Sequence, residues 1–176
     1  MTDTIFALSS GAPPAAIAVV RVSGRQALAV GTILAGELPE PRRAGLRRLV
    51  DRHGAALDDA LVLAFPGPNT ATGEDLLELH LHGGRAVVRA VLAALAEHPG
   101  LRAAEAGEFT RRALTNGRID LAEAEGLADL LEAESELARR VALTAAEGGV
   151  SRAAGAWTRQ LRMLSARLEA QIDFAA

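Results

Sequence analysis

The chain contains no cysteine among its 176 residues. This absence excludes disulfide bonds, zinc sites with thiolate ligands, iron–sulfur clusters and a cysteine nucleophile. Lysine is also absent, since all 19 basic residues are arginine. A Walker A phosphate loop requires a lysine, as does an enzyme that forms a Schiff base with its substrate. This chain alone is therefore expected to be neither a P-loop nucleotidase nor a Schiff-base enzyme.

Aromatic residues make up only 3% of the sequence, so the core must be built from Leu, Val and Ala. No apolar run approaches the roughly 18 residues that cross a bilayer. The first residues, MTDTIFALSSG, lack the basic flank of a secretory signal. We therefore expect a cytoplasmic protein without membrane contact. Its length and its 49% apolar content suit one domain, or a compact domain with a smaller appendage.

Excess positive charge is also missing, because the formal net charge is −3 and the isoelectric point is near 5.8. This balance argues against a protein that holds nucleic acid by bulk electrostatics. The charge is nevertheless uneven: the stretch PRRAGLRRLVDR carries five arginines and one acid, whereas residues 119–137 carry seven acids and no base. Such runs are usually solvated faces, and we interpret both in this way.

The first two thirds of the chain alternates strand and helix signals. Strands are expected in TIFALS and AIAVVRVS, a helix in RQALAVGTIL, a strand pair in GLRRLV and LDDALVLAF, a strand in GEDLLELHLHGG and a helix over about 85–97. These elements predict a mixed α/β (α+β) domain over residues 1–118, with a mixed sheet and flanking helices.

The remaining residues, 119–176, are expected to be helical. Asp120 and Glu123 have the spacing of a capping box, and Gly148-Gly149 is the expected break. An apolar seam follows at intervals of four and three, formed by Trp157, Leu161, Leu164, Leu168 and Ile172. A single helix cannot bury such a seam on itself. The segment is therefore expected to belong to an incomplete bundle whose other helices come from elsewhere.

The strand in GEDLLELHLHGG places Glu78, His80 and His82 on one face and three leucines on the other. The polar face has three interpretations. His, His and carboxylate suit zinc or ferrous iron, although side chains about 7 Å apart along one strand strain a three-ligand site. The face can also simply meet water. In the third interpretation, Glu78 accepts two adjacent N–H groups of a ligand, such as the edge of a pterin.

Arg21 stands inside an apolar strand and needs a carboxylate or an anionic ligand beside it. A salt bridge, for instance to Glu78, and a ligand contact are both open. The loop FPGPNTATGED is either a connection between strands or a stiff loop that shapes a pocket. In AGEFTRRALTNGRIDLAEAE we expect a short helix from Gly107, a turn at Asn116-Gly117 and a new helix at Asp120. Arg118 in that turn is free to reach a ligand or a partner.

Together, these motifs resemble a known family. FPGPNTATGEDLLELHLHGG, followed by AGEFTRRALTNGRIDLAEAEGLADLLEA and preceded by AVVRVSG, is similar to the N-terminal region of the MnmE (TrmE) family of tRNA modification GTPases. The resemblance covers essentially the whole chain, with several long motifs in the right order.

The resemblance implies a cytoplasmic homodimer that works with tRNA and with the FAD-dependent partner MnmG. Together they install a carboxymethylaminomethyl-type group on carbon 5 of the wobble uridine (U34), using a tetrahydrofolate one-carbon unit. Residues 1–118 would form the folate-binding and dimerisation domain, similar to the folate-binding fold of the aminomethyltransferase of glycine cleavage. Residues 119–176 would form the first part of the helical domain.

The resemblance also implies a cofactor, 5-formyl-tetrahydrofolate or another one-carbon tetrahydrofolate, with contacts at Arg21, Glu78 and Arg118. It implies no metal ligand in this chain and identifies no catalytic residue. GTP, Mg²⁺ and K⁺ would bind in the family's GTPase domain, which this chain lacks, so the chain is expected to be an N-terminal fragment unable to hydrolyse GTP. Arg118 stands where the family typically has lysine, and SSGAPPAAIAVV replaces a glycine-rich first loop.

Two alternatives come from other functional classes. The chain can be a non-catalytic dimerisation or scaffold module whose pocket is vestigial. It can also be a metal-dependent hydrolase that uses Glu78, His80 and His82.

Overall fold

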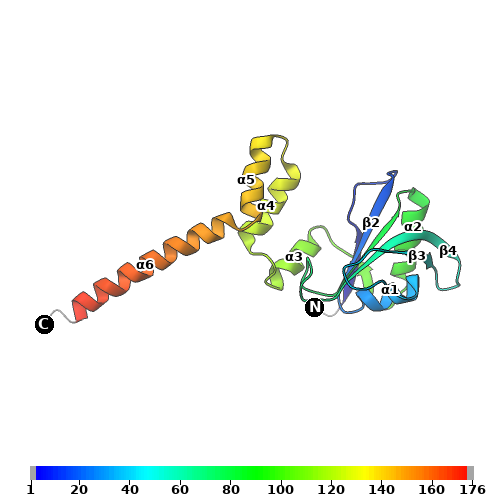
Figure 1. Ribbon diagram of the computed structural model, residues 1–176, viewed down its shortest axis with the longest axis horizontal. Helices are drawn as coiled ribbons and strands as arrows, with labels where there is room; N and C mark the ends of the chain where they lie inside the picture. Colours follow the sequence, from blue (N-terminus) through cyan, green and yellow to red (C-terminus); the bar gives the residue numbers. More distant parts are fainter. Residues whose placement is uncertain (1–2, 174–176) are drawn as a thin grey trace. The chain divides into compact units, whose positions relative to one another are not determined.

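The computed structural model describes residues 3–173, and the chain divides into two compact units, Met1–Arg118 and Ile119–Ala176 (Figure 1). The chain ends, 1–2 and 174–176, which the expected domains include, lie outside the described residues. A mixed sheet with flanking helices forms the first unit and helices form the second, which confirms the predicted fold class. The two units are described separately.

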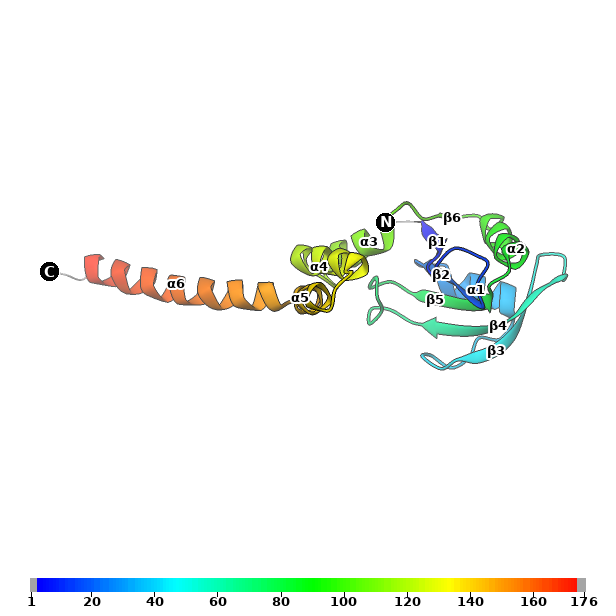
Figure 2. The same ribbon diagram turned by 90° about the horizontal axis from the view of Figure 1, so that it is seen from above.

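The first unit contains a six-stranded sheet in the order β3-β4-β5-β2-β1-β6 (Figure 2). The strands are β1 (Thr4–Leu8), β2 (Ile17–Ser23), β3 (Gly45–Val50), β4 (Ala56–Phe65), β5 (Leu76–His82) and β6 (Leu101–Ala103). Neighbouring strands are antiparallel, except that β1 and β6 are parallel. The three-residue strand β6 was not predicted, because it is too short to show a period in the sequence.

The core lies on the leucine face of β5. Leu77, Leu79 and Leu81 are buried together with side chains from helices α1 (Ala27–Ala35) and α2 (Arg85–Ala96). The alternation predicted for this strand is therefore confirmed. On the opposite face, Ile17, Leu46 and Leu61 are 60%, 65% and 45% exposed. This second face, called the open face below, also carries the side chains of Glu78 and His80, because Ile17 pairs with His82 and Leu61 with His80.

The second unit contains α4 (Leu121–Glu132), α5 (Glu136–Ala146) and α6 (Gly149–Asp173). The predicted capping box is present, since the Glu123 amide donates to Asp120 Oδ1 at 2.9 Å and the Asp120 amide donates to Glu123 Oε2 at 2.8 Å. The predicted break falls at Gly148, which has a φ of 77°. A further break, not predicted, separates α4 from α5, where the Ser135 hydroxyl caps α5 by accepting from the Ala138 amide.

The predicted seam lies along α6. All five of its side chains, from Trp157 to Ile172, are more than half exposed, and no residue of α6 is buried. In the described part of the chain, no helix combines the length and the apolar character that crossing a membrane requires.

We predict that Gly126→Ala destabilises the α4–α5 hairpin. Alanine is favoured over glycine inside a helix by about 1 kcal/mol, but a Cβ at Gly126 would lie 2.4 Å from the Ala146 nitrogen. Backbone atoms cannot move aside cheaply, so the steric cost should exceed the helix preference. Far-ultraviolet circular dichroism during thermal unfolding should show a lower midpoint.

Gly155→Ala in α6 is the matched control for this prediction. Its Cβ would meet only the flexible end of Arg159, at 3.6 Å, so the same substitution should raise helix stability. A stabilising Gly126→Ala would contradict the close approach of the two helices.

Candidate functional site

The candidate site is built on the pairing of β2 with β5, which sets Arg21 opposite Glu78. Nε and Nη2 of Arg21 both donate to Oε1 of Glu78, at 3.0 and 2.7 Å. The two side chains are 31% and 17% exposed, so the pair is largely shielded from water. The guanidinium of Arg21 also lies over the ring of Phe109, 5.9 Å from its centroid. The salt bridge, one of the two interpretations of Arg21, is therefore present.

Glu78 keeps acceptor capacity after this pairing. Both arginine bonds fall on Oε1, and Oε2 lies 3.4 Å from Nε2 of His80, which is longer than a strong hydrogen bond. A carboxylate offers about four lone-pair sites, two on each oxygen. The carboxylate of Glu78 is thus oriented by Arg21 without being saturated by it.

A cavity of about 180 Å³ lies beside Glu78. Its lining comes from β4, from the loop that follows it, from β5 and from the segment before β3, and consists of Arg42, Phe65, Asn69, Thr70, Ala71, Leu76 and Glu78. Apolar walls with one carboxylate and one guanidinium are the composition of a site for a small polar heterocycle.

The loop over residues 66–75 is held in a defined shape. The Gly67 amide donates to the Asp75 carboxylate at 2.8 Å, and the Thr70 hydroxyl donates to the Glu74 carbonyl at 2.6 Å. The buried hydroxyl of Thr72 lies 2.7 Å from that of Ser23 on β2. These bonds favour the interpretation of this segment as a stiff loop that shapes a pocket.

Arg118 reaches the cavity only indirectly. Its Nε donates to the Thr70 carbonyl at 3.1 Å, and the neighbouring Asn116 donates to the Thr72 carbonyl at 2.7 Å. The side chain of Arg118 is exposed and does not line the cavity. The structure therefore brings Arg21 and Glu78 into direct contact and attaches Arg118 to the loop beside them.

Only His80 approaches Glu78, and the three side chains do not converge on one point. His82 turns toward β4, where its Nδ1 lies 2.7 Å from Oδ1 of Asp58, and it is 74% exposed. His80 and His82 instead line a hollow of about 260 Å³ on the open face, together with Ile17 and Leu46. Among residues 3–173, no three His, Cys, Asp or Glu side chains are grouped as metal ligands. This geometry gives the metal-hydrolase alternative no support.

A buried ion cluster, which the sequence did not reveal, lies behind the loop. The fully buried Arg112 of α3 (Glu108–Thr115) donates to Glu74 and to Glu108, in each case at 3.1 Å, and to the Asp3 carbonyl at 3.0 Å. Arg102 adds a two-pronged bond to Glu108, at 2.8 and 2.6 Å. The i, i+4 spacing of Glu108 and Arg112 was the only local signal, since the other partners are distant in sequence.

The cluster changes the titration of Glu108. Hydrogen bonds from Arg102, then from the Glu105 amide and from Arg112, lower the pKa of Glu108 to about 2, against the desolvation that would raise it. Glu74 belongs to the loop and accepts a further bond from the Ser23 hydroxyl at 2.8 Å. The cluster therefore fixes one end of the loop to β1, β2 and α3.

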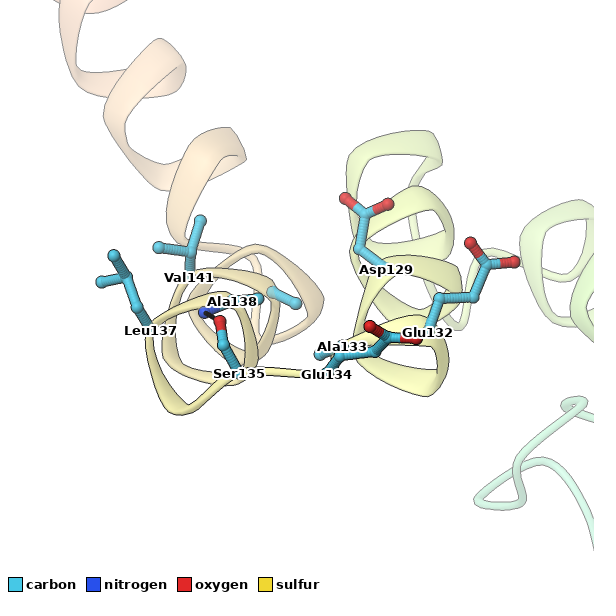
Figure 3. Close-up of a pocket in the computed structure, with 9 residues that line it drawn as sticks. Asp129, Glu132, Ala133, Glu134, Ser135, Leu137, Ala138 and Val141 are labelled. Carbon is cyan, nitrogen blue, oxygen red and sulfur yellow. Dashed lines mark hydrogen bonds between the residues drawn. The ribbon is translucent and has the colours of Figure 1, made fainter.

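The helical unit has a larger, open groove between α4 and α5, with a volume of about 880 Å³. Asp129, Glu132 and Glu134 lie on one side, and Leu137 and Val141 on the other (Figure 3). Acidic side chains at an open groove identify no ligand by themselves, so the candidate site remains the cavity beside Glu78.

Comparison with known proteins gives a family match over both units. Residues 4–118 match the family model described as GTP-binding protein TrmE N-terminus, and residues 121–176 match the MnmE helical domain. The chain is 65% identical to the tRNA modification GTPase MnmE of Novosphingobium aromaticivorans, over 99% of this chain and 40% of that protein. It is 60% identical to that of Erythrobacter litoralis, over 98% and 41%. The chain thus spans about 40% of the length of these relatives.

We predict that Glu108→Gln weakens the fold and alters its response to acid. Removing one partner of a buried ion pair costs roughly 3 to 5 kcal/mol, which should appear as a lower free energy of unfolding at neutral pH. The pKa of Glu108 is about 2 in the folded chain against an ordinary 4.5, so its contribution is complete above 4.5 and lost as the pH falls toward 2. Urea unfolding between pH 6 and 2, in steps of about one unit, should show this loss in the unchanged chain and a flatter profile in the variant.

Glu105→Gln provides the control, since this exposed carboxylate pairs with Arg111 at 3.0 Å on the surface. It should change the free energy of unfolding by less than about 1 kcal/mol. Equal profiles for Glu108→Gln and the unchanged chain would show that the cluster does not hold the fold.

Proposed function

Since the chain belongs to the TrmE N-terminus family, we propose that it forms the folate-binding and dimer-forming part of a cytoplasmic tRNA modification GTPase. Residues 1–118 are the folate-binding and dimerisation domain of this proposal, and residues 119–176 begin its helical domain. The complete protein would modify carbon 5 of U34 in tRNA, together with the FAD-dependent MnmG. GTP, Mg²⁺ and K⁺ would be bound by a GTPase domain outside these 176 residues.

One observation carries the folate proposal: a mostly shielded carboxylate, oriented by an arginine, borders a cavity of about 180 Å³. The pyrimidine edge of a reduced pterin presents two neighbouring N–H donors, and a carboxylate accepts such a pair in a bidentate manner. Arg21 binds Glu78 through Oε1 and thereby orients the carboxylate, which can accept hydrogen bonds from the ligand without rearranging. The apolar side chains of Leu76 and Phe65 suit the faces of a flat ring.

Arg118 is proposed to supply positive charge outside the cavity. It is exposed and attached to the Thr70 carbonyl, so it lies beside the loop rather than against the ring. A glutamate tail carries carboxylates at a distance from the pterin, and a guanidinium binds a carboxylate through two parallel hydrogen bonds. This is a different geometry from that of the lysine that is typical of the family.

We propose the open face as the homodimer surface. Leu46 on β3 and Leu61 on β4 are exposed next to each other, and Ile17 on β2 is exposed across β5 from them; all three line the hollow of about 260 Å³. Apolar patches of this kind are uncommon on monomers, and a two-fold interface would pair the patch with its own copy.

The exposed seam of α6 has a separate explanation. Residues 121–176 match the MnmE helical domain, and the chain covers about 40% of its relatives. We propose that further helices of that domain, from the part of the relatives that this chain does not span, cover the seam.

The folate proposal predicts that Glu78→Gln impairs binding of 5-formyl-tetrahydrofolate. Loss of a charged acceptor costs about 1.5 to 3 kcal/mol, so the Kd measured by titration calorimetry should rise roughly 10- to 150-fold. Glu97→Gln is the control, because Glu97 follows α2, away from the cavity, and pairs with Arg52 at the surface.

Unchanged affinity in Glu78→Gln would remove this residue from the site. If the unchanged chain forms a stable dimer and takes up no folate, the scaffold alternative is supported and the folate proposal is wrong.

The dimer proposal predicts that Ile17→Asp produces monomers. A charge on the open face would be buried without a partner in the interface, which strongly opposes association. Light scattering coupled to size-exclusion chromatography measures the mass. Ile33→Asp on α1 is the matched control, since Ile33 is 56% exposed and outside the open face. A monomer in both variants, or a dimer in both, would place the interface elsewhere.

A further inference from the structure

Arg42 occupies an unusual position at the mouth of the cavity. Its φ of 65° makes it the only non-glycine residue with positive φ in the described part of the chain. This left-handed conformation is unfavourable for residues with a Cβ, and such outliers concentrate where a side chain has a function. Glycine would adopt the same backbone without strain, so an arginine at this position carries a local conformational cost.

Three contacts hold Arg42 in place, one through its backbone and two through its side chain. Its backbone amide donates to the Ala64 carbonyl of β4 at 2.9 Å. Its guanidinium lies over the ring of Phe65, 5.8 Å from the centroid, and Nη2 donates to the Asn69 carbonyl. The bond to Asn69 uses one of the five N–H donors of the guanidinium. The side chain is therefore aimed at the cavity while it keeps the capacity to bind an anion.

The size of the cavity determines where the rest of the ligand lies. Its volume of about 180 Å³ is below the roughly 300 to 1,000 Å³ that enclose a drug-sized ligand. A ring system beside Glu78 would fill it, and the remainder of a folate must leave through the rim. Among the residues that line the cavity, Arg42 carries the positive charge and Glu78 the negative charge. The two ends of the site are thus opposite in charge.

We propose that Arg42 binds a carboxylate of the folate tail and thereby selects ligands that carry the glutamate; this inference rests on the proposed function of the cavity. Arg42 and Arg118 donate to consecutive carbonyls of the loop, those of Asn69 and Thr70. The two arginines are therefore attached to adjacent residues of the loop. Their number equals that of the carboxylates of a glutamate, so each can bind one. The guanidinium of Arg42, supported on Phe65, presents its edge to the tail.

The test compares two ligands, 5-formyl-tetrahydrofolate and the primary amide of 5-formyl-tetrahydropteroate, which carries neither the glutamate nor any tail carboxylate. Titration calorimetry on the full 176-residue chain gives Kd for each ligand with the unchanged chain and with Arg42→Gly. Glycine keeps the left-handed backbone, so only the side chain is lost. We expect Arg42→Gly to weaken the glutamate-bearing ligand about tenfold, as for one charged hydrogen bond, and to leave the Kd of the pteroate amide unchanged.

Arg43→Gly is the matched control, because Arg43 is exposed and pairs with Glu40 at the surface, at 3.4 Å. It should change neither Kd. An equal loss for both ligands in Arg42→Gly would show that Arg42 only shapes the cavity, and no loss for either would show that it makes no contact. Both results overturn this inference alone. Failure of the unchanged chain to bind either ligand overturns the proposed function and this inference with it.

Discussion

The buried guanidinium of Arg112 is the constraint on which the geometry of the first unit depends. An ion in a protein interior requires acceptors on its donor groups, because leaving it unpaired costs several kcal/mol. The acceptors come from three separate parts of the chain, namely Asp3 before β1, Glu74 in the loop and Glu108 on α3. The fold can pair both terminal nitrogens of Arg112 with these carboxylates only when the three segments meet, so the position of the loop follows from the need to pair one charge. Because Glu74 also binds Ser23, the end of β2 is fixed in the same arrangement, two residues from Arg21. The loop held in this way lines the cavity beside Glu78, together with β4, β5 and the segment before β3.

This arrangement separates the group that builds the pocket from the groups proposed to bind the ligand. Arg112 is fully buried, and its Nη1 and Nη2 donate to the carboxylates of Glu74 and Glu108 in addition to the Asp3 carbonyl. Arg42 and Arg118 are exposed, and each donates to a backbone carbonyl of the loop. Carbonyl acceptors leave the charge of a guanidinium uncompensated, whereas carboxylates neutralise it. The two exposed arginines therefore retain a net positive charge at the rim of the cavity, where an anion can approach from water.

Local patterns in the sequence predicted the parts of the fold that depend on neighbours along the chain. Alternation in LLELHLH predicted the buried face of β5, and the spacing of Asp120 and Glu123 predicted the capping box. Arg21 was expected to point to the face opposite Val20 and Val22 and to need a charged partner there. Glu78 is that partner. The rest depends on contacts between distant residues. Arg42 lies in an arginine-rich run that was interpreted as a solvated face. Its positive φ and its contact with Asn69 could not be predicted, because no local sequence pattern indicates either of them. The partners of Arg112 are 109, 38 and 4 residues away, so only the last had a visible spacing.

The helix α6 carries an apolar stripe that the described residues leave exposed. Isolated helices are marginal in water even when their sequences favour helix, and most helical stability in proteins comes from packing of an apolar face. α6 has 25 residues and no buried side chain, although its apolar residues recur with the spacing of a buried stripe. The sequence thus specifies a packing surface that stays exposed among the described residues of the helical unit. The open face of the sheet has the same property, with large apolar side chains where a solvated strand would carry polar ones. The two surfaces differ in the occupant they need. We propose that the sheet face pairs with its own copy across a two-fold axis, whereas further helices of the matched helical domain cover the stripe along α6.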